Sequence, residues 1–110
     1  MKPIPSPTDL EYKHLLNEIK WRKRHKLITE EVEKYIMDAY NDDEWDWRLS
    51  DGCTGVNELY WPTKYQPNCV SHDYYCWKAN KLPRKEADKL RKWSDKLFYR
   101  GNVAFGISKF

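Results

Sequence analysis

The chain is poor in cysteine and has no long apolar run. Three cysteines among 110 residues allow at most one disulfide and leave one thiol over. No apolar stretch approaches the length of a signal-peptide core or a membrane span, and the first eight residues are proline-rich instead. We therefore expect a soluble protein that carries no secretory signal and no transmembrane segment.

Glycine is scarce as well, with four residues in the chain. The sequence contains no glycine-rich phosphate loop and no Gly-x-Ser-x-Gly nucleophile elbow. The acidic run from Asn41 to Trp47 lacks the glycine and the fixed spacing of an EF-hand. We expect this run to be a solvated loop.

Charge is unevenly distributed, although the net charge is only +3. Residues 1–28 hold seven basic and three acidic side chains (net +4), residues 29–51 hold two and nine (net −7), and residues 78–100 hold nine and three (net +6). Two interpretations stay open. The acidic and basic segments face each other, or the basic segments meet an anionic surface through long-range attraction.

Aromatic residues make up 15% of the chain, including six tryptophans and eight tyrosines. A chain of this length forms one domain with one modest core. We expect that core to be built from large rings, several of which stay partly at the surface.

Helical periodicity marks the N-terminal part of the chain. A first helix is expected where apolar residues recur at i, i+3, i+4 and i+7, namely Tyr12, Leu15, Leu16 and Ile19. Ser6 or Thr8 is its expected N-cap. Thr29 is the expected N-cap of a second helix, with two glutamates in its first turn. The apolar face of this second helix consists of Val32, Tyr35, Ile36 and Ala39.

Two further helices are expected near the C-terminus. One runs from about Pro67 or Asn68 to about Asn80, and the other runs from Arg84 to about Arg100, with Pro83 in its first helical position. The main apolar stripe of the last helix consists of Ala87, Leu90, Trp93 and Leu97. Because only two or three residues join these helices, they should pack antiparallel, and the fold class is all-α.

The stretch from Cys69 to Trp77 carries the strongest chemical signal, an adjacent His72 and Asp73. Neighbouring side chains on a helix point about 100° apart, so the pair cannot act on one target. It can serve two neighbouring tasks, with the imidazole as a base and the carboxylate as a ligand for a hard cation. The alternatives are an idle surface dipeptide or zinc, although Cys69-x-x-His72 lacks a second ligand pair.

The residues around this pair resemble the phospholipase A2 family, in its short bacterial and phage forms. The resemblance rests on the Gly-Cys-x-Gly loop at 51–56, the Cys-x-x-His-Asp core, the Lys-Glu-Ala-Asp segment at 85–88 and the closing residues 100–106. It implies two antiparallel catalytic helices that follow an irregular calcium-binding loop. The single domain of 1–110 would comprise a flexible arm (1–8), two N-terminal helices (9–47) and the phospholipase A2-like core (51–106).

The resemblance also implies a role for each site residue. His72 would be the general base on water, oriented by an aspartate of the last helix, for which we prefer Asp88 over the alternative Asp95. Asp73 would bind Ca²⁺ together with backbone carbonyls of the loop, from Gly52, Thr54 and Val56. Cys53 and Cys69 would form a disulfide.

The chain departs from the family pattern at two places. Cys76 stands four residues after the histidine, where the family has a tyrosine that bonds the orienting aspartate, and the adjacent Tyr75 is the candidate to replace it. Thr54 and Val56 occupy loop positions where a more flexible sequence is expected.

Three functional hypotheses follow. The first is a calcium-dependent lipid hydrolase that acts at a phospholipid membrane surface, aided by basic and aromatic residues of the last helix: Arg84, Lys85, Lys89, Trp93 and Lys96. The second is an inactive fold that serves as a bacterial or phage binding module, either in the virion or in the cytoplasm. A nucleic-acid binder that uses the cluster from Trp21 to Lys26 is less favoured, so no nucleic-acid partner is expected.

Overall fold

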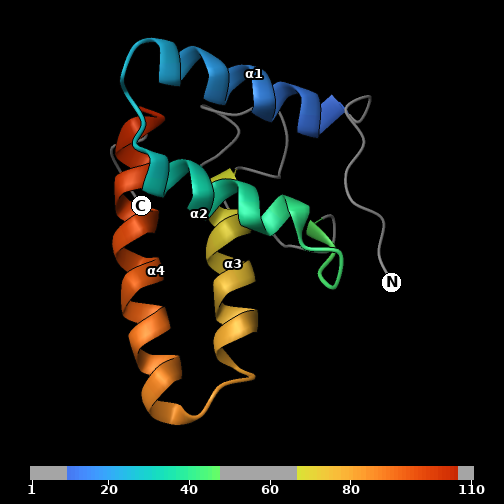
Figure 1. Ribbon diagram of the computed structural model, residues 1–110, viewed down its shortest axis with the longest axis vertical. Coiled ribbons are helices and arrows are strands. Elements are labelled where there is room, and N and C mark those ends of the chain that lie inside the picture. The colour runs from blue at the N-terminus through green and yellow to red at the C-terminus, as the bar shows by residue number, and fades with distance from the viewer. Residues whose placement is uncertain (1–9, 48–66, 107–110) are drawn as a thin grey trace.

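The computed structural model describes residues 10–47 and 67–106 of the chain. These residues form helices and no strand, which confirms the all-α class. The helices are α1 (Leu10–Arg24), α2 (Glu30–Asn41), α3 (Pro67–Ala79) and α4 (Arg84–Ala104) (Figure 1).

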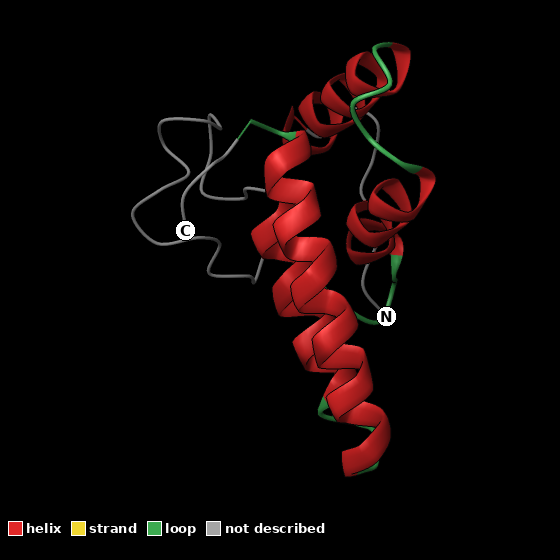
Figure 2. Cartoon of the chain, turned by 90° about the vertical axis from the view of Figure 1, so that its left-hand side faces the viewer, coloured by secondary structure: helices red, strands yellow, loops and turns green. Residues whose placement is uncertain are grey.

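Helices α3 and α4 run antiparallel and form a hairpin, and α2 crosses that hairpin near the C-terminal end of α4 (Figure 1). α2 contacts both α3 and α4. The view turned by 90° shows α1 and α2 on one side of the hairpin (Figure 2). One face of α3 and α4 is therefore covered by the N-terminal helices.

α1 begins within the described residues at Leu10, so its expected caps Ser6 and Thr8 lie outside them. Its predicted apolar face is confirmed, because three of the four residues are buried and the fourth packs partly against the core: Tyr12, Leu15, Ile19 and Leu16. The helix ends on basic residues, which interact favourably with its dipole. Lys26 then adopts a left-handed conformation (φ 58°), and the Leu27 amide donates to the Arg22 carbonyl at 2.8 Å.

α2 forms where capping and periodicity predicted it. The Thr29 side chain accepts a hydrogen bond from the Val32 amide at 3.2 Å, and Glu30 and Glu31 lie in the first turn. All four residues of the predicted apolar face are buried: Val32, Tyr35, Ile36 and Ala39.

The α3–α4 hairpin differs from the prediction at its loop and at the end of α4. The loop has four residues, Asn80 to Pro83, and Pro83 is the N-cap of α4 rather than its first helical residue. α4 also continues to Ala104, past Gly101. Gly101 lies inside the helix at a close-packed position: a Cβ there would lie 2.1 Å from the Asn68 Oδ1 atom.

The core is aromatic, as the composition predicted, and draws on all four helices. The Tyr35 ring stacks on the Tyr75 ring at 5.2 Å, and Trp93 meets both rings edge-on at 5.7 and 5.0 Å. The expectation of a solvated loop after α2 is wrong for its tryptophans. Trp47 is 2% exposed and packs against the Tyr40 ring at 5.0 Å, because burial of a large apolar ring is favourable while the acidic side chains of the run stay at least partly exposed.

Candidate functional site

His72 of α3 contacts Asp95 of α4 across the hairpin. The distance between His72 Nε2 and Asp95 Oδ1 is 2.8 Å. The imidazole also packs against the Phe98 ring, with 4.9 Å between ring centroids. The His72 side chain is 31% exposed and the Asp95 side chain is 68% exposed, so the pair opens to solvent.

The contact assigns different tasks to the two ring nitrogens of His72. When Nε2 carries the proton and donates it to Asp95, the Nδ1 atom holds the lone pair. Within residues 10–47 and 67–106, no other group is bonded to this imidazole. The geometry thus leaves Nδ1 able to accept a proton from water, which is what a general base requires.

The structure corrects the preferred partner of His72 from Asp88 to the alternative, Asp95. Asp88 lies seven residues earlier on α4, about 10 Å along the helix axis, and pairs with Arg91 at 3.5 Å. The preference for Asp88 followed its Ala-Asp sequence context. Contact across a hairpin depends instead on how the two helices are aligned, which the length of the loop helps to set.

Tyr75 does not replace the tyrosine that the family has near this aspartate. Its hydroxyl donates to Asp38 Oδ2 at 3.0 Å, on the side of α3 that faces α2. Cys76, four residues after His72, is a half-buried free thiol. Burial raises the pKa of this thiol, the Asp73 and Asp95 carboxylates raise it further, and Arg91 opposes them. Cys76 therefore lies in the negative field of the site and is a poor nucleophile at neutral pH.

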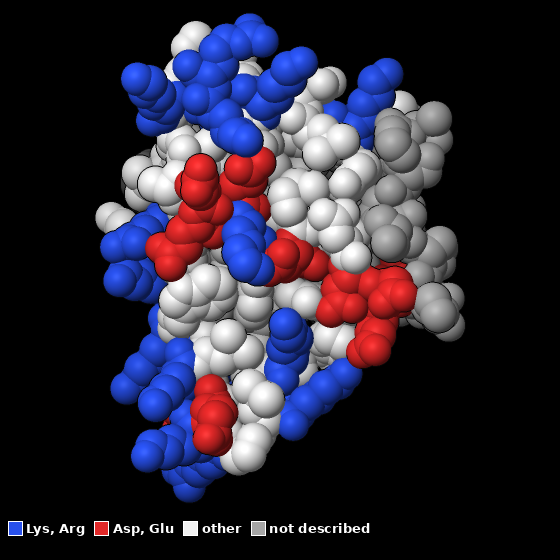
Figure 3. Space-filling view, in the orientation of Figure 1, with Lys and Arg blue, Asp and Glu red and all other residues white. Residues whose placement is uncertain are grey.

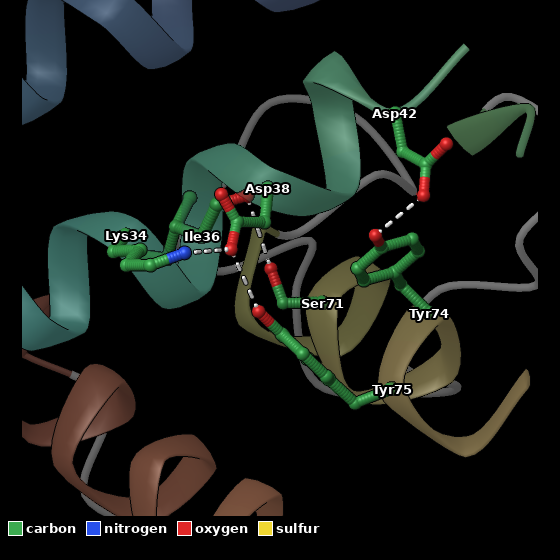
Figure 4. A network of polar contacts seen from close by, with 7 residues as sticks. All are labelled: Lys34, Ile36, Asp38, Asp42, Ser71, Tyr74 and Tyr75. Carbon is green, nitrogen blue, oxygen red and sulfur yellow. Dashed lines mark hydrogen bonds and ion pairs between the residues drawn. The ribbon is translucent and has the colours of Figure 1, made fainter. Parts of the chain in front are cut away.

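Hydrogen bonds between α2 and α3 set the rotation of α3 (Figure 4). The Tyr74 hydroxyl donates to Asp42 Oδ2 at 2.6 Å, one helical turn beyond the Tyr75–Asp38 bond. The Ser71 hydroxyl donates to the carbonyl of Ile36 at 3.3 Å. Because these three donors of α3 point toward α2, His72 is held toward α4.

The same hydrogen bonds affect the aspartates that accept them, Asp42 and Asp38. Although partial burial by itself raises the pKa of the Asp42 carboxyl, the Tyr74 hydroxyl, the Glu44 amide and the nearby lysines 78 and 81 together lower it. Burial and the adjacent Asp42 carboxylate raise the pKa of Tyr74, which stays a neutral donor. Lys34 adds an ion pair to Asp38 at 2.7 Å.

Of the expected calcium ligands, only Asp73 lies within the described residues. Asp73 is half-buried beside His72 on α3, whereas Gly52, Thr54 and Val56 lie outside the described residues. Within the described ranges, no three His, Cys, Asp or Glu side chains are grouped to hold a metal. The ligand that lies within the described residues, the Asp73 carboxylate, is of the oxygen type that hard cations prefer.

The disulfide prediction can be followed at one of its two residues. Cys69, at the start of α3, is disulfide-bonded, and Cys76 is free. The expected partner Cys53 lies outside the described residues.

The surface of α4 is not the basic and aromatic surface that the sequence predicted. Trp93 is partly buried, and its Nε1 atom donates to Glu31 Oε2 at 3.3 Å. Lys23–Glu33 and Arg100–Glu31 pairs, at 3.3 and 3.5 Å, connect basic segments to acidic α2. In the space-filling view acidic side chains cross the middle of the molecule between two basic ends (Figure 3). No helix of the described residues has the length and apolarity to span a bilayer.

Comparisons with models of protein families, with curated proteins and with solved structures find no match to this chain.

Proposed function

We propose that this protein is a calcium-dependent, phospholipase A2-like hydrolase that cleaves an acyl ester of a glycerophospholipid. The observation that carries the proposal is the 2.8 Å contact between His72 and Asp95, with Asp73 next to His72 on the same helix. This arrangement supplies a base, a group that orients the base, and a carboxylate suited to a hard cation.

In this mechanism His72 Nδ1 removes a proton from a water molecule whose oxygen attacks the ester carbonyl carbon. The same proton then passes to the departing alcohol oxygen as the ester bond breaks. Asp95 accepts the Nε2–H bond, which holds the tautomer and stabilises the protonated ring. Asp73 and carbonyls of Gly52, Thr54 and Val56 would hold Ca²⁺, and the bound ion supplies Lewis-acid polarisation of the carbonyl.

The exposure of Asp95 sets the size of its expected effect. A carboxylate that is 68% exposed competes with water for the imidazole, unlike an orienting carboxylate in a buried triad. We therefore expect Asp95→Asn to lower kcat roughly 10–100-fold, well below the ~10⁴-fold seen when a buried triad aspartate is replaced.

The test is fatty-acid release from mixed phospholipid–detergent micelles, measured with Ca²⁺ and with EGTA. Activity should require Ca²⁺, His72→Gln should abolish it, and Asp95→Asn should reduce it. Asp88→Asn is the matched control on the same helix and should retain parental activity, because Asp88 pairs with Arg91. Calcium-independent release, or equal loss in the two aspartate variants, would refute the proposal.

A second candidate is a fold of this kind that has lost its activity and serves as a phage or bacterial accessory binding module. The presence of Cys76 in place of a tyrosine and the exposure of Asp95 favour it. Calorimetric titration separates the two candidates. The hydrolase should bind Ca²⁺ in a way that Asp73→Asn abolishes, whereas the binding module should show no Ca²⁺ site that involves Asp73.

A further inference from the structure

Exposed large apolar side chains concentrate where the C-terminal ends of α1 and α4 meet. Among the described residues, four of the six such side chains belong to this junction. They are Trp21 (48% exposed), Leu27 (49%), Tyr99 (70%) and Val103 (57%). The other two, Leu10 and Leu82, lie at the start of α1 and in the α3–α4 loop.

These four side chains line two hollows in the surface. Trp21, Leu27 and Val103 border one of about 460 Å³, and Leu27, Tyr99 and Val103 border a second of about 290 Å³. Both hollows also share Arg100 and Ala104, so they adjoin each other, and we call the two together the α1–α4 groove. An apolar depression of this kind on a small protein indicates an interaction surface.

Basic side chains surround the groove. Within it Arg100 reaches Glu31 at 3.5 Å, and beside it Arg22 and Lys23 pair with glutamates at 2.7 and 3.3 Å. Arg24 and Lys26 are exposed and form no ion pair with any residue in the described ranges. Basic side chains gather over this end of the molecule at the upper left of the space-filling view (Figure 3). The rim therefore keeps a positive charge that suits an anionic surface.

The groove continues toward the candidate site along α4. Asp95, Tyr99 and Val103 are spaced at i, i+4 and i+8 and are all exposed, so they follow one face of the helix. The helical rise places Tyr99 about 6 Å and Val103 about 12 Å from Asp95 along the axis. A partner in the groove would thus reach to within one or two helical turns of the His72–Asp95 pair.

We propose that the α1–α4 groove is the surface by which the protein docks on an anionic phospholipid bilayer. Trp21 and Tyr99 have the amphipathic rings that favour the headgroup level, Leu27 and Val103 enter the acyl boundary, and Arg24 and Lys26 contact lipid phosphates. The docking itself requires no calcium and no catalysis. Its orientation delivers a lipid toward Asp95, and this last point rests on the proposed hydrolase function.

A bilayer fits this surface better than it fits the other basic end of the molecule. The α3–α4 loop carries Leu82, but the nearby tryptophan of α3, Trp77, packs partly against the core under Lys81, whose Nζ lies 3.5 Å from the ring centroid. The loop end thus offers charge with one apolar side chain, whereas the groove offers four apolar side chains and charge together. Binding to bilayers requires buried apolar area as well as electrostatic attraction.

The test is co-sedimentation of the full chain with vesicles of phosphatidylcholine mixed with phosphatidylglycerol, in EGTA. The groove variant Leu27→Ser/Val103→Ser should bind on the order of tenfold more weakly, because apolar area is lost. Its matched control, Leu10→Ser/Leu82→Ser, removes two exposed apolar side chains outside the groove and should bind like the parent. Circular dichroism and thermal melting verify that each variant is folded.

Charge is tested in the same assay. Arg24→Glu/Lys26→Glu should bind more weakly by roughly tenfold or more, since each basic residue near an anionic membrane contributes about fivefold. Lys85→Glu/Lys89→Glu, at the other basic end, makes the same change in net charge and should bind within about twofold of the parent. Equal losses in the two charge variants would overturn the proposal, because they would show that only net charge matters.

Two further outcomes separate this proposal from the hydrolase function. His72→Gln should bind vesicles like the parent, because docking does not use the imidazole. If the parent docks on vesicles yet releases no fatty acid with Ca²⁺ present, the function is refuted and the docking surface stands. If the parent binds no vesicle yet releases fatty acid from dispersed short-chain lipid, the docking surface is refuted and the function stands. Self-association that Leu27→Ser/Val103→Ser abolishes, without vesicle binding, would make the groove a contact between copies and overturn the proposal.

Discussion

At the residue scale, the candidate site depends on which aspartate meets His72. The divergence of the His72 and Asp73 side chains could be predicted from the sequence, because both lie on one helix and adjacent helical positions diverge by about 100° whatever the rest of the fold does. The choice between Asp88 and Asp95 as the partner of His72 could not be predicted in this way. Both carboxylates lie on exposed parts of α4, and only the alignment of α4 against α3 brings Asp95 to 2.8 Å from the imidazole.

The thiol of Cys76 reports on this alignment. Because Asp73 and Asp95 help to raise its pKa, Cys76 should react with a disulfide reagent at pH 8 more slowly than a cysteine in an unstructured peptide. Asp95→Asn removes one of these charges, lowers the pKa of the thiol and should speed the reaction severalfold. Asp88→Asn should leave the rate unchanged. If Asp88→Asn is the variant that speeds labelling, the alignment described above is wrong.

At the scale of elements, α3 is fixed by side-chain bonds to α2 as well as by the aromatic core. Two aspartates one turn apart, Asp38 of α2 and Asp42 at the C-cap of α2, accept hydrogen bonds from adjacent tyrosines of α3 (Figure 4). Periodicity predicted both helices and their apolar faces. The pairing between them follows from how the helices cross, which no pattern within either helix contains.

The Tyr74–Asp42 bond should make stability depend on acid pH. Because the pKa of Asp42 is lowered in the folded state, its contribution is present above the unfolded value of about 3.9 and is lost as pH falls through the lower folded value. Tyr74→Phe should therefore cost roughly 1–2 kcal/mol of unfolding free energy at pH 7. The difference from the parent should narrow below about pH 4.

Urea denaturation at pH 7 and at acid pH measures this change. Tyr99→Phe is the matched control, since it removes the hydroxyl of an exposed tyrosine and should have little effect at either pH. A loss in Tyr74→Phe that is the same at both pH values would show that the ionised Asp42 carboxylate is not the acceptor.

The crossing of α3 and α4 should be sensitive to Gly101. Alanine normally stabilises a helix interior by about 1 kcal/mol relative to glycine, but its Cβ would lie 2.1 Å from Asn68 Oδ1 in a fully buried space. We expect Gly101→Ala to destabilise the protein by about 2 kcal/mol or more. Thermal or urea unfolding measures the loss.

Asn68→Ala combined with Gly101→Ala should recover most of that stability. The Asn68 amide has no hydrogen-bond partner among the described residues, so removing it sacrifices no such bond. Additive losses in the double variant would show that the two positions do not meet.

At the scale of the whole molecule, Arg22 joins the first helix to the end of the last. Its Nε atom donates to the carbonyl of Ala104, 82 residues away, at 3.0 Å. Its guanidinium lies 4.2 Å from the centroid of the Phe105 ring. This side chain satisfies a carbonyl at the C-terminus of α4 and fixes one wall of the α1–α4 groove.

Arg22→Lys should weaken this connection while it keeps the charge. A lysine cannot donate from the Nε position while it stacks on the ring, so we expect a loss of about 1–2 kcal/mol in the free energy of unfolding. Arg24→Lys, at an exposed position in the same turn, should change stability by less than about 0.5 kcal/mol. Equal effects in a urea titration would refute the bridging role of Arg22.

The sequence by itself determined the helical class, the approximate position of the helices and the divergence of His72 from Asp73 on one of them, because capping, periodicity and helix geometry are local properties. The tertiary structure decided what those local rules leave open. It paired His72 with Asp95, directed Tyr75 to Asp38, buried Trp47 and gathered Trp21, Leu27, Tyr99 and Val103 into one groove. Apart from the Trp47–Tyr40 contact, these features join residues that are distant in the chain, and their alignment follows from packing between helices, which no single segment encodes.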